Sequence, residues 1–169
     1  MTTEEDIIEP FRIALKLEKD GREFFLKAAR ETQSRLARQT FAFLAKEENR
    51  HIEKIEAFYA AMQNTEAAEL PLTEDSDAED KLEAFNQRLE GLKAEFEPAV
   101  SDLEAYRFAL EFENGAEDFY EDFLEKSDNP RVRKFYRWLI HEEKMHARLL
   151  KSCLKFVEDP AEWFKRRKA

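Results

Sequence analysis

Two copies of a Glu-x-x-His motif lie 95 residues apart in this chain, Glu48 with His51 and Glu143 with His146. On a helix, residues three apart lie one turn apart on nearly the same face, so each pair can offer an oxygen and a nitrogen to one metal ion. A single copy in an acidic chain would be weak evidence, because short motifs often arise by chance. Two copies at one offset are much stronger evidence for a metal site.

A further glutamate precedes each motif by 30 residues, on a core-facing helical stripe: Glu18 in the first half and Glu113 in the second. Carboxylates in an apolar interior are costly, and grouping four of them adds repulsion between like charges. Two divalent cations would neutralise the four carboxylates, and two imidazoles would complete the set of ligands. Oxygen and nitrogen ligands without thiolate suit iron or manganese, with zinc as a common substitute. The sequence therefore predicts a site for two metal ions, formed by Glu18, Glu48, His51, Glu113, Glu143 and His146.

The residues around these motifs repeat with the same offset, which indicates a duplicated helical hairpin. The matched pairs include Phe11 with Tyr106, Ala14 with Ala109, Leu15 with Leu110, Phe24 with Phe119 and Phe25 with Tyr120. Start and stop signals predict four helices, over residues 10–31, 34–62, 101–126 and 130–158. We expect the starts to be set by Pro10, by Ser34 as an N-cap, by Ser101 in a capping box with Glu104, and by Asn129 followed by Pro130.

The segment between the two hairpins is long. Residues 65–80 are polar and acidic and predict a loop, whereas the apolar spacing over residues 82–96 predicts a short helix before Pro98. The linkers inside each hairpin are short, so the paired helices should be antiparallel neighbours. The predicted fold class is therefore all-α: a four-helix bundle of two duplicated antiparallel hairpins joined by a long crossover that contains a short helix. We expect it to form a single domain over residues 1–169.

Composition narrows the classes of function. The formal net charge of −10 argues against nucleic acid as a partner, because phosphate would be repelled. Cys153 is the one cysteine in the chain, so a disulfide framework is excluded and a buried core thiol is expected. The acidic start resembles no signal peptide, and no apolar run is long enough to cross a bilayer. These features predict a cytoplasmic protein without membrane contact.

Several other residues are weaker candidates for chemistry. Glu47 and Glu142 are duplicated beside the motifs, and an exposed helix flank is the favoured interpretation for both. His141 breaks the repeat, because Lys46 is its counterpart, and we expect it to be solvated. The tyrosines lie at core spacing and are interpreted first as packing residues. We expect Trp163 and Phe164 to dock after the last helix.

These motifs resemble the rubrerythrin branch of the ferritin-like superfamily. The resemblance runs from Ala14-x-x-x-Glu18-x-x-Gly21-x-x-Phe24-Phe25 and Glu48-x-x-His51 to Ala109-x-x-x-Glu113, Phe119-Tyr120 and Glu143-x-x-His146. It implies a ferritin-like bundle in which the six predicted ligands hold two iron ions, with Glu48 and Glu143 bridging them. Rubrerythrins proper also carry a four-cysteine rubredoxin domain, which these residues lack, and a further glutamate where this chain has Ala116.

Three functions follow as hypotheses from the resemblance and the predicted site. The first is a non-haem di-iron oxidoreductase that reduces peroxide or dioxygen with electrons from an external donor such as a rubredoxin. The second is ferroxidase activity, with iron handling or storage. The third is a non-catalytic scaffold or sensor that metal stabilises. The resemblance also implies a homodimer.

Overall fold

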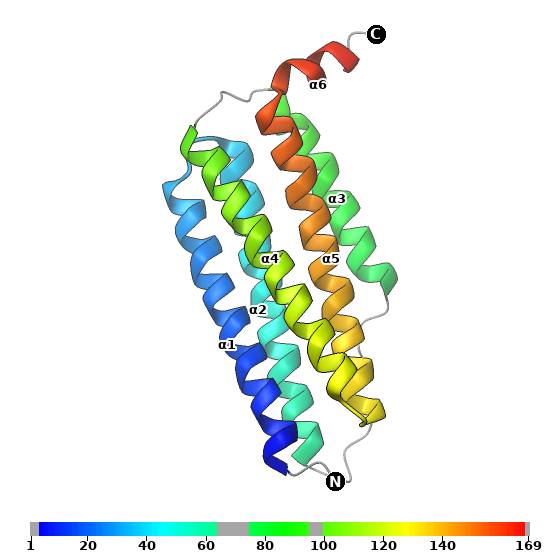
Figure 1. Ribbon diagram of the computed structural model, residues 1–169. Coiled ribbons are helices and arrows are strands. Elements are labelled where there is room, and N and C mark those ends of the chain that lie inside the picture. Colours follow the sequence, from blue (N-terminus) through cyan, green and yellow to red (C-terminus); the bar gives the residue numbers. More distant parts are fainter. Residues whose placement is uncertain (1–3, 64–74, 95–99, 168–169) are drawn as a thin grey trace.

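The computed structural model describes the backbone of residues 4–63, 75–94 and 100–167, and the side chains of 8–63, 80, 82–94 and 101–166. The described residues form helices and no strand. The helices, shown in Figure 1, are α1 (Glu4–Glu31), α2 (Arg35–Gln63), α3 (Asp75–Lys93), α4 (Val100–Lys126), α5 (Pro130–Glu158) and α6 (Pro160–Arg167).

Four long helices make up the bundle. Helices α1 and α2 pack as one antiparallel hairpin and α4 and α5 as the other, while α3 lies along the outside against α2 and α5 (Figure 1). The short α6 continues from the end of α5, where Trp163 packs edge-on against Phe156 and against Phe164. The predicted all-helical architecture of two hairpins with a helix between them is confirmed.

Helix caps explain two of the helix starts. Ser34 Oγ accepts a hydrogen bond from the backbone N–H of Ala37 at 3.1 Å, so Ser34 caps α2 as predicted. Asn129 Oδ1 accepts from the backbone N–H groups of Arg131 and Val132 at the start of α5, ahead of Pro130. The sequence did not reveal a third capping contact. Asp102 of α4 is fully buried and accepts from the backbone N–H groups of residues 33 and 34 at 3.1 Å, which ties the second hairpin to the turn of the first.

Four predicted helix boundaries were wrong. Helix α1 begins at Glu4, so Pro10 lies inside it; the acidic residues 4–6 favour a helix start, and proline removes only one backbone N–H donor. Helix α4 begins at Val100, which places Ser101 inside the helix rather than at its cap. Helix α3 begins at Asp75 and ends at Lys93, so it starts seven residues earlier and ends three residues earlier than predicted. Residues 64–74 of the middle segment lie outside the described part of the chain.

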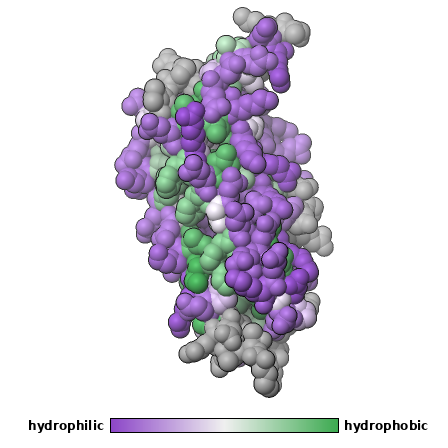
Figure 2. All heavy atoms as spheres, viewed as in Figure 1, coloured by the Kyte–Doolittle hydropathy of each residue, from purple (hydrophilic) through white to green (hydrophobic). Residues whose placement is uncertain are grey.

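The core consists of two apolar clusters, one toward each end of the bundle. One is built around Phe25, Phe41 and Tyr106 and includes Cys153, which is 1% exposed, so the predicted core thiol is confirmed. The other is built around Phe11, Phe135 and other aromatic side chains. Apolar side chains also reach the surface along the face shown in Figure 2, flanked by hydrophilic ones. No helix among the described residues is long and apolar enough to cross a membrane.

Candidate metal centre

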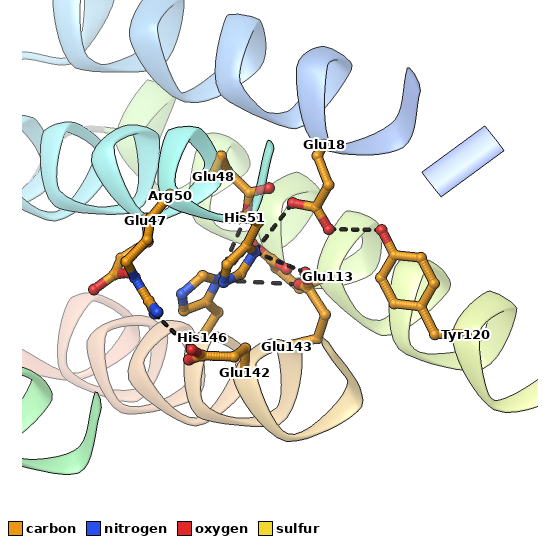
Figure 3. A network of polar contacts seen from close by, with 10 residues as sticks. All are labelled: Glu18, Glu47, Glu48, Arg50, His51, Glu113, Tyr120, Glu142, Glu143 and His146. Atoms are coloured by element: carbon orange, nitrogen blue, oxygen red, sulfur yellow. Dashed lines mark hydrogen bonds and ion pairs between the residues drawn. The ribbon is translucent and has the colours of Figure 1, made fainter. Parts of the chain in front are cut away.

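The six predicted ligands come together in the middle of the bundle, between the two apolar clusters (Figure 3). Helix α1 contributes one glutamate, α2 a glutamate and a histidine, α4 one glutamate, and α5 a glutamate and a histidine. All six are buried, at 0 to 3% exposure: Glu18, Glu48, His51, Glu113, Glu143 and His146. Core-facing helical periodicity therefore predicted the burial of all six side chains, and their role as metal ligands stays a prediction.

Each histidine lies between a carboxylate of its own hairpin and one of the other hairpin. Nδ1 of His51 is 3.1 Å from Oε2 of Glu18 and 3.4 Å from Oε1 of Glu143. Nδ1 of His146 is 3.6 Å from Oε1 of Glu113 and 3.5 Å from Oε1 of Glu48. The two imidazole rings stack with centroids 5.0 Å apart. The duplication in the sequence thus becomes a nearly symmetric site, in which Glu48 and Glu143 reach across between the hairpins.

Seven polar atoms of the site's side chains are buried without a hydrogen-bond partner. They are Oε1 of Glu48, both carboxylate oxygens of Glu113 and of Glu143, Nε2 of His51 and Nδ1 of His146. Buried polar atoms are normally satisfied, so such a concentration needs an explanation. Ligand atoms of Glu48, His51, Glu143 and His146 all lie within 4.8 Å of one another. Cations bound among the carboxylates would satisfy these oxygens and Nδ1 of His146, so the residues fit a pair of metal ions.

Comparison with models of known protein families identifies the family of the chain. The rubrerythrin family model matches residues 9–154, which include most of each of the four long helices and all six buried side chains, and it matches residues 104–169 a second time. The chain belongs to the rubrerythrin family. Its architecture is accordingly a ferritin-like bundle with the buried carboxylate and imidazole site of that family. Comparisons with curated proteins and with solved structures returned no match.

The electrostatics of this rubrerythrin-family site are those expected of carboxylates crowded in a dry interior. Burial, reinforced by the charges of neighbouring carboxylates, holds the pKa values of Glu48 and Glu143 well above their ordinary range. Burial alone would also raise the pKa of Glu18, but the charge of His51 and hydrogen bonds hold it below its ordinary value. The two glutamates that reach between the hairpins are therefore the ones that hold protons most strongly when no cation is bound.

Tyr120 contributes a contact that packing considerations alone did not predict. Its Oη donates a hydrogen bond to Oε1 of Glu18 at 2.6 Å, from α4 to α1 (Figure 3). Both residues are buried, at 0 and 1% exposure. The hydroxyl fixes one oxygen of the carboxylate, which leaves the other facing His51. The sequence offered one signal for this role, because the matching position in the first hairpin is Phe25, which has no hydroxyl.

Gly21 lies against another of the site carboxylates. A Cβ atom at this position would be 2.8 Å from Cε1 of Phe112 and 3.4 Å from Oε2 of Glu48. The first distance is shorter than real carbon contacts allow, so the absence of a side chain lets α1 approach α4 beside the site. The glycine noted in the sequence motif is thus explained by packing.

The interpretation of Glu47 and Glu142 as an exposed flank was wrong. They are 8% and 1% exposed, and Arg50 joins them. Its Nε donates to Oε2 of Glu47 at 2.7 Å and its Nη2 donates to Oε1 of Glu142 at 2.6 Å (Figure 3). Both carboxylates can be buried because one guanidinium forms ion pairs with them. The sequence does not show this pairing, because it depends on how the two hairpins pack. His141 is half-buried rather than fully solvated.

Proposed function

We infer that the chain is a di-iron oxidoreductase that reduces peroxide with electrons from an external donor. Its proposed metal ligands are Glu18, Glu48, His51, Glu113, Glu143 and His146. The observation that carries the proposal is the buried cluster of Glu48, His51, Glu143 and His146, whose ligand atoms lie within 4.8 Å of one another. Membership of the rubrerythrin family supports iron as the metal and peroxide as the substrate.

The chain's own residues supply a site suited to this chemistry. When bound, a pair of iron ions would supply two electrons and positive charge to hold the substrate oxygens. With two protons, those electrons convert one hydrogen peroxide into two waters. The aromatic cluster around Phe11 and Phe135 and the cluster around Phe25 and Tyr106 exclude bulk water from either end.

The proposal assigns different roles to the glutamates. Glu48 and Glu143 each lie near the histidine of the opposite hairpin, at 3.5 and 3.4 Å, which suits carboxylates that bridge two ions. Glu18 and Glu113 each lie near the histidine of their own hairpin, which suits terminal ligands. Tyr120 would keep Glu18 in its terminal orientation through the 2.6 Å hydrogen bond.

An external donor is proposed because these residues hold too few cysteines for a rubredoxin-type iron site. Cys153 is the one cysteine among the 169 residues, so these residues cannot build a four-thiolate iron site. A carrier protein such as a rubredoxin would return the oxidised metal pair to the ferrous state. Action as a homodimer and as a single domain stays a prediction.

Anaerobic stopped-flow spectroscopy tests this function. The protein is loaded with two ferrous ions per chain and mixed with hydrogen peroxide or with dioxygen. We expect one equivalent of peroxide to oxidise both ions much faster than dioxygen does, with both ions retained. Absence of oxidation by peroxide would remove the proposal. Faster oxidation by dioxygen with release of ferric iron would favour ferroxidase activity instead.

A further inference from the structure

Basic side chains are concentrated in the first hairpin, in contrast to the acidic chain as a whole. Between residues 16 and 54 there are ten lysines and arginines, although the chain overall carries a formal net charge of −10. Seven acidic residues lie in the same stretch, and three of them, Glu18, Glu47 and Glu48, are buried. The exposed side chains of this stretch of α1 and α2 therefore include more basic than acidic residues.

A groove of about 650 Å³ lies on the surface of this hairpin, between α1 and α2. Arg22 and Lys46 supply positive charge to its polar side, which Arg50 also lines although its guanidinium is already paired with Glu47 and Glu142. Glu53 is the single carboxylate among the lining residues. Leu26, an unusually exposed leucine at 44%, contributes to its apolar side. Alanines of both helices line the rest of that side, so the groove combines a small apolar centre with a cationic rim. Small interfaces of this kind suit brief encounters between proteins.

The groove lies close to the candidate metal centre. Arg50 lines the groove and is adjacent in sequence to His51, one of the proposed ligands. Its guanidinium lies 5.8 Å from the ring centre of Trp138, and that ring meets the imidazole of His51 edge-on at 5.6 Å. Trp138 is 7% exposed, so this aromatic side chain lies under the surface beside the site. An electron delivered at the groove would therefore pass only Arg50, Trp138 and His51 on its way to the metal site.

We propose that the groove between α1 and α2 binds an acidic one-electron carrier protein and that electrons enter the site there. The inference rests on the proposed function, because it names the docking surface of the donor that this function needs. Two successive reduced carriers would each give up one electron, which returns the metal pair to its ferrous state. A second copy of the chain fits less well, because a two-fold axis through the groove would bring the positive charges of Arg22 and Lys46 in the two copies close together. Nucleic acid would meet repulsion from the rest of the chain.

Binding of a redox-inert carrier tests the docking surface without relying on activity. Zinc-substituted rubredoxin of acidic sequence is titrated into the metal-loaded protein at low ionic strength, and the dissociation constant is measured by calorimetry. The test variant carries Arg22→Glu and Lys46→Glu, and the matched control carries Lys134→Glu and Lys151→Glu, which are exposed on α5. We expect the test variant to bind at least about tenfold more weakly and the control to bind within about twofold of the native chain. Added salt should weaken native binding.

The inference would be overturned if rubredoxin binding were weakened equally in the test and control variants, or in neither of them. It would also be overturned if the groove substitutions abolished self-association of the chain, or if the protein bound a DNA duplex in place of rubredoxin. Single-turnover oxidation by peroxide, measured without any carrier, should be the same in both variants. Its absence from the native protein would remove the proposed function while leaving the binding result standing. The two failures are therefore distinguishable.

Discussion

Tyr120 holds Glu18 through a hydrogen bond of 2.6 Å between the two hairpins. Replacing Tyr120 with Phe should free the carboxylate to rotate, and we expect metal affinity to fall about tenfold, as for other hydrogen bonds that orient ligands. Competition titration with a metal indicator measures the change. Tyr106→Phe is the matched control, because Tyr106 is also buried, in the apolar cluster around Phe25, but its hydroxyl contacts Thr40. Equal affinities for the two variants would contradict this positioning role.

Replacing Gly21 with alanine should affect stability differently from replacing the other helical glycines with alanine. An added Cβ at Gly91 or Gly115 meets nothing within 4 Å, so Gly115→Ala should raise the free energy of unfolding by about 0.5–1 kcal/mol. Gly21→Ala would place Cβ 2.8 Å from Phe112, so we expect it to be less stable than Gly115→Ala by about 1 kcal/mol or more. Urea unfolding of the metal-free variants measures both. A gain at Gly21 as large as that at Gly115 would refute the close approach.

Arg50 is the cation shared by two buried carboxylates, Glu47 and Glu142. Arg50→Met introduces the residue found at the matching position 145, and it should destabilise the metal-free protein by about 3 kcal/mol because both carboxylates lose their partner. A triple variant that adds Glu47→Gln and Glu142→Gln should recover much of this loss. Chemical denaturation tests both statements. If the triple variant is no more stable than Arg50→Met, unpaired charge is not the cause.

The free energy of unfolding should depend on pH in the alkaline range through the thiol of Cys153. Burial raises the pKa of its thiol from 9.0 to about 11. Because the folded protein holds this proton more strongly than the unfolded chain does, the thiol's contribution is complete below pH 9 and is lost as pH rises toward 11. The stability advantage of the native protein over Cys153→Ala should therefore shrink by about 2 kcal/mol between about pH 8 and pH 11. Urea unfolding of both proteins across this range measures it, and a constant difference would count against a buried neutral thiol.

The sequence was most informative where periodicity and duplication agreed. The four core-facing glutamates and two histidines were found because charged groups on an apolar helical stripe stand out, and a second copy at the same offset made coincidence improbable. Helix ends were predicted well where a side chain caps its own helix, as Ser34 and Asn129 do.

The sequence was least informative where a residue depends on a partner that is distant in the chain. Burial of Glu142 depends on Arg50, which is 92 residues away, and periodicity cannot reveal such a pairing. Asp102 likewise caps a turn 68 residues away. Tyr120 looked like packing, because its hydroxyl acquires a role only when α1 places Glu18 opposite. In each case the tertiary arrangement of the two hairpins supplies the missing contact.

The central claim is that four inward-facing carboxylates and two imidazoles hold a pair of metal ions. Anomalous diffraction at the iron edge, from crystals of protein loaded with ferrous iron, tests it most directly. The account predicts two peaks within bonding distance of Glu18, Glu48, His51, Glu113, Glu143 and His146, with Glu48 and Glu143 contacting both. Crystals that show no iron there, or these side chains turned away from one another, would contradict it.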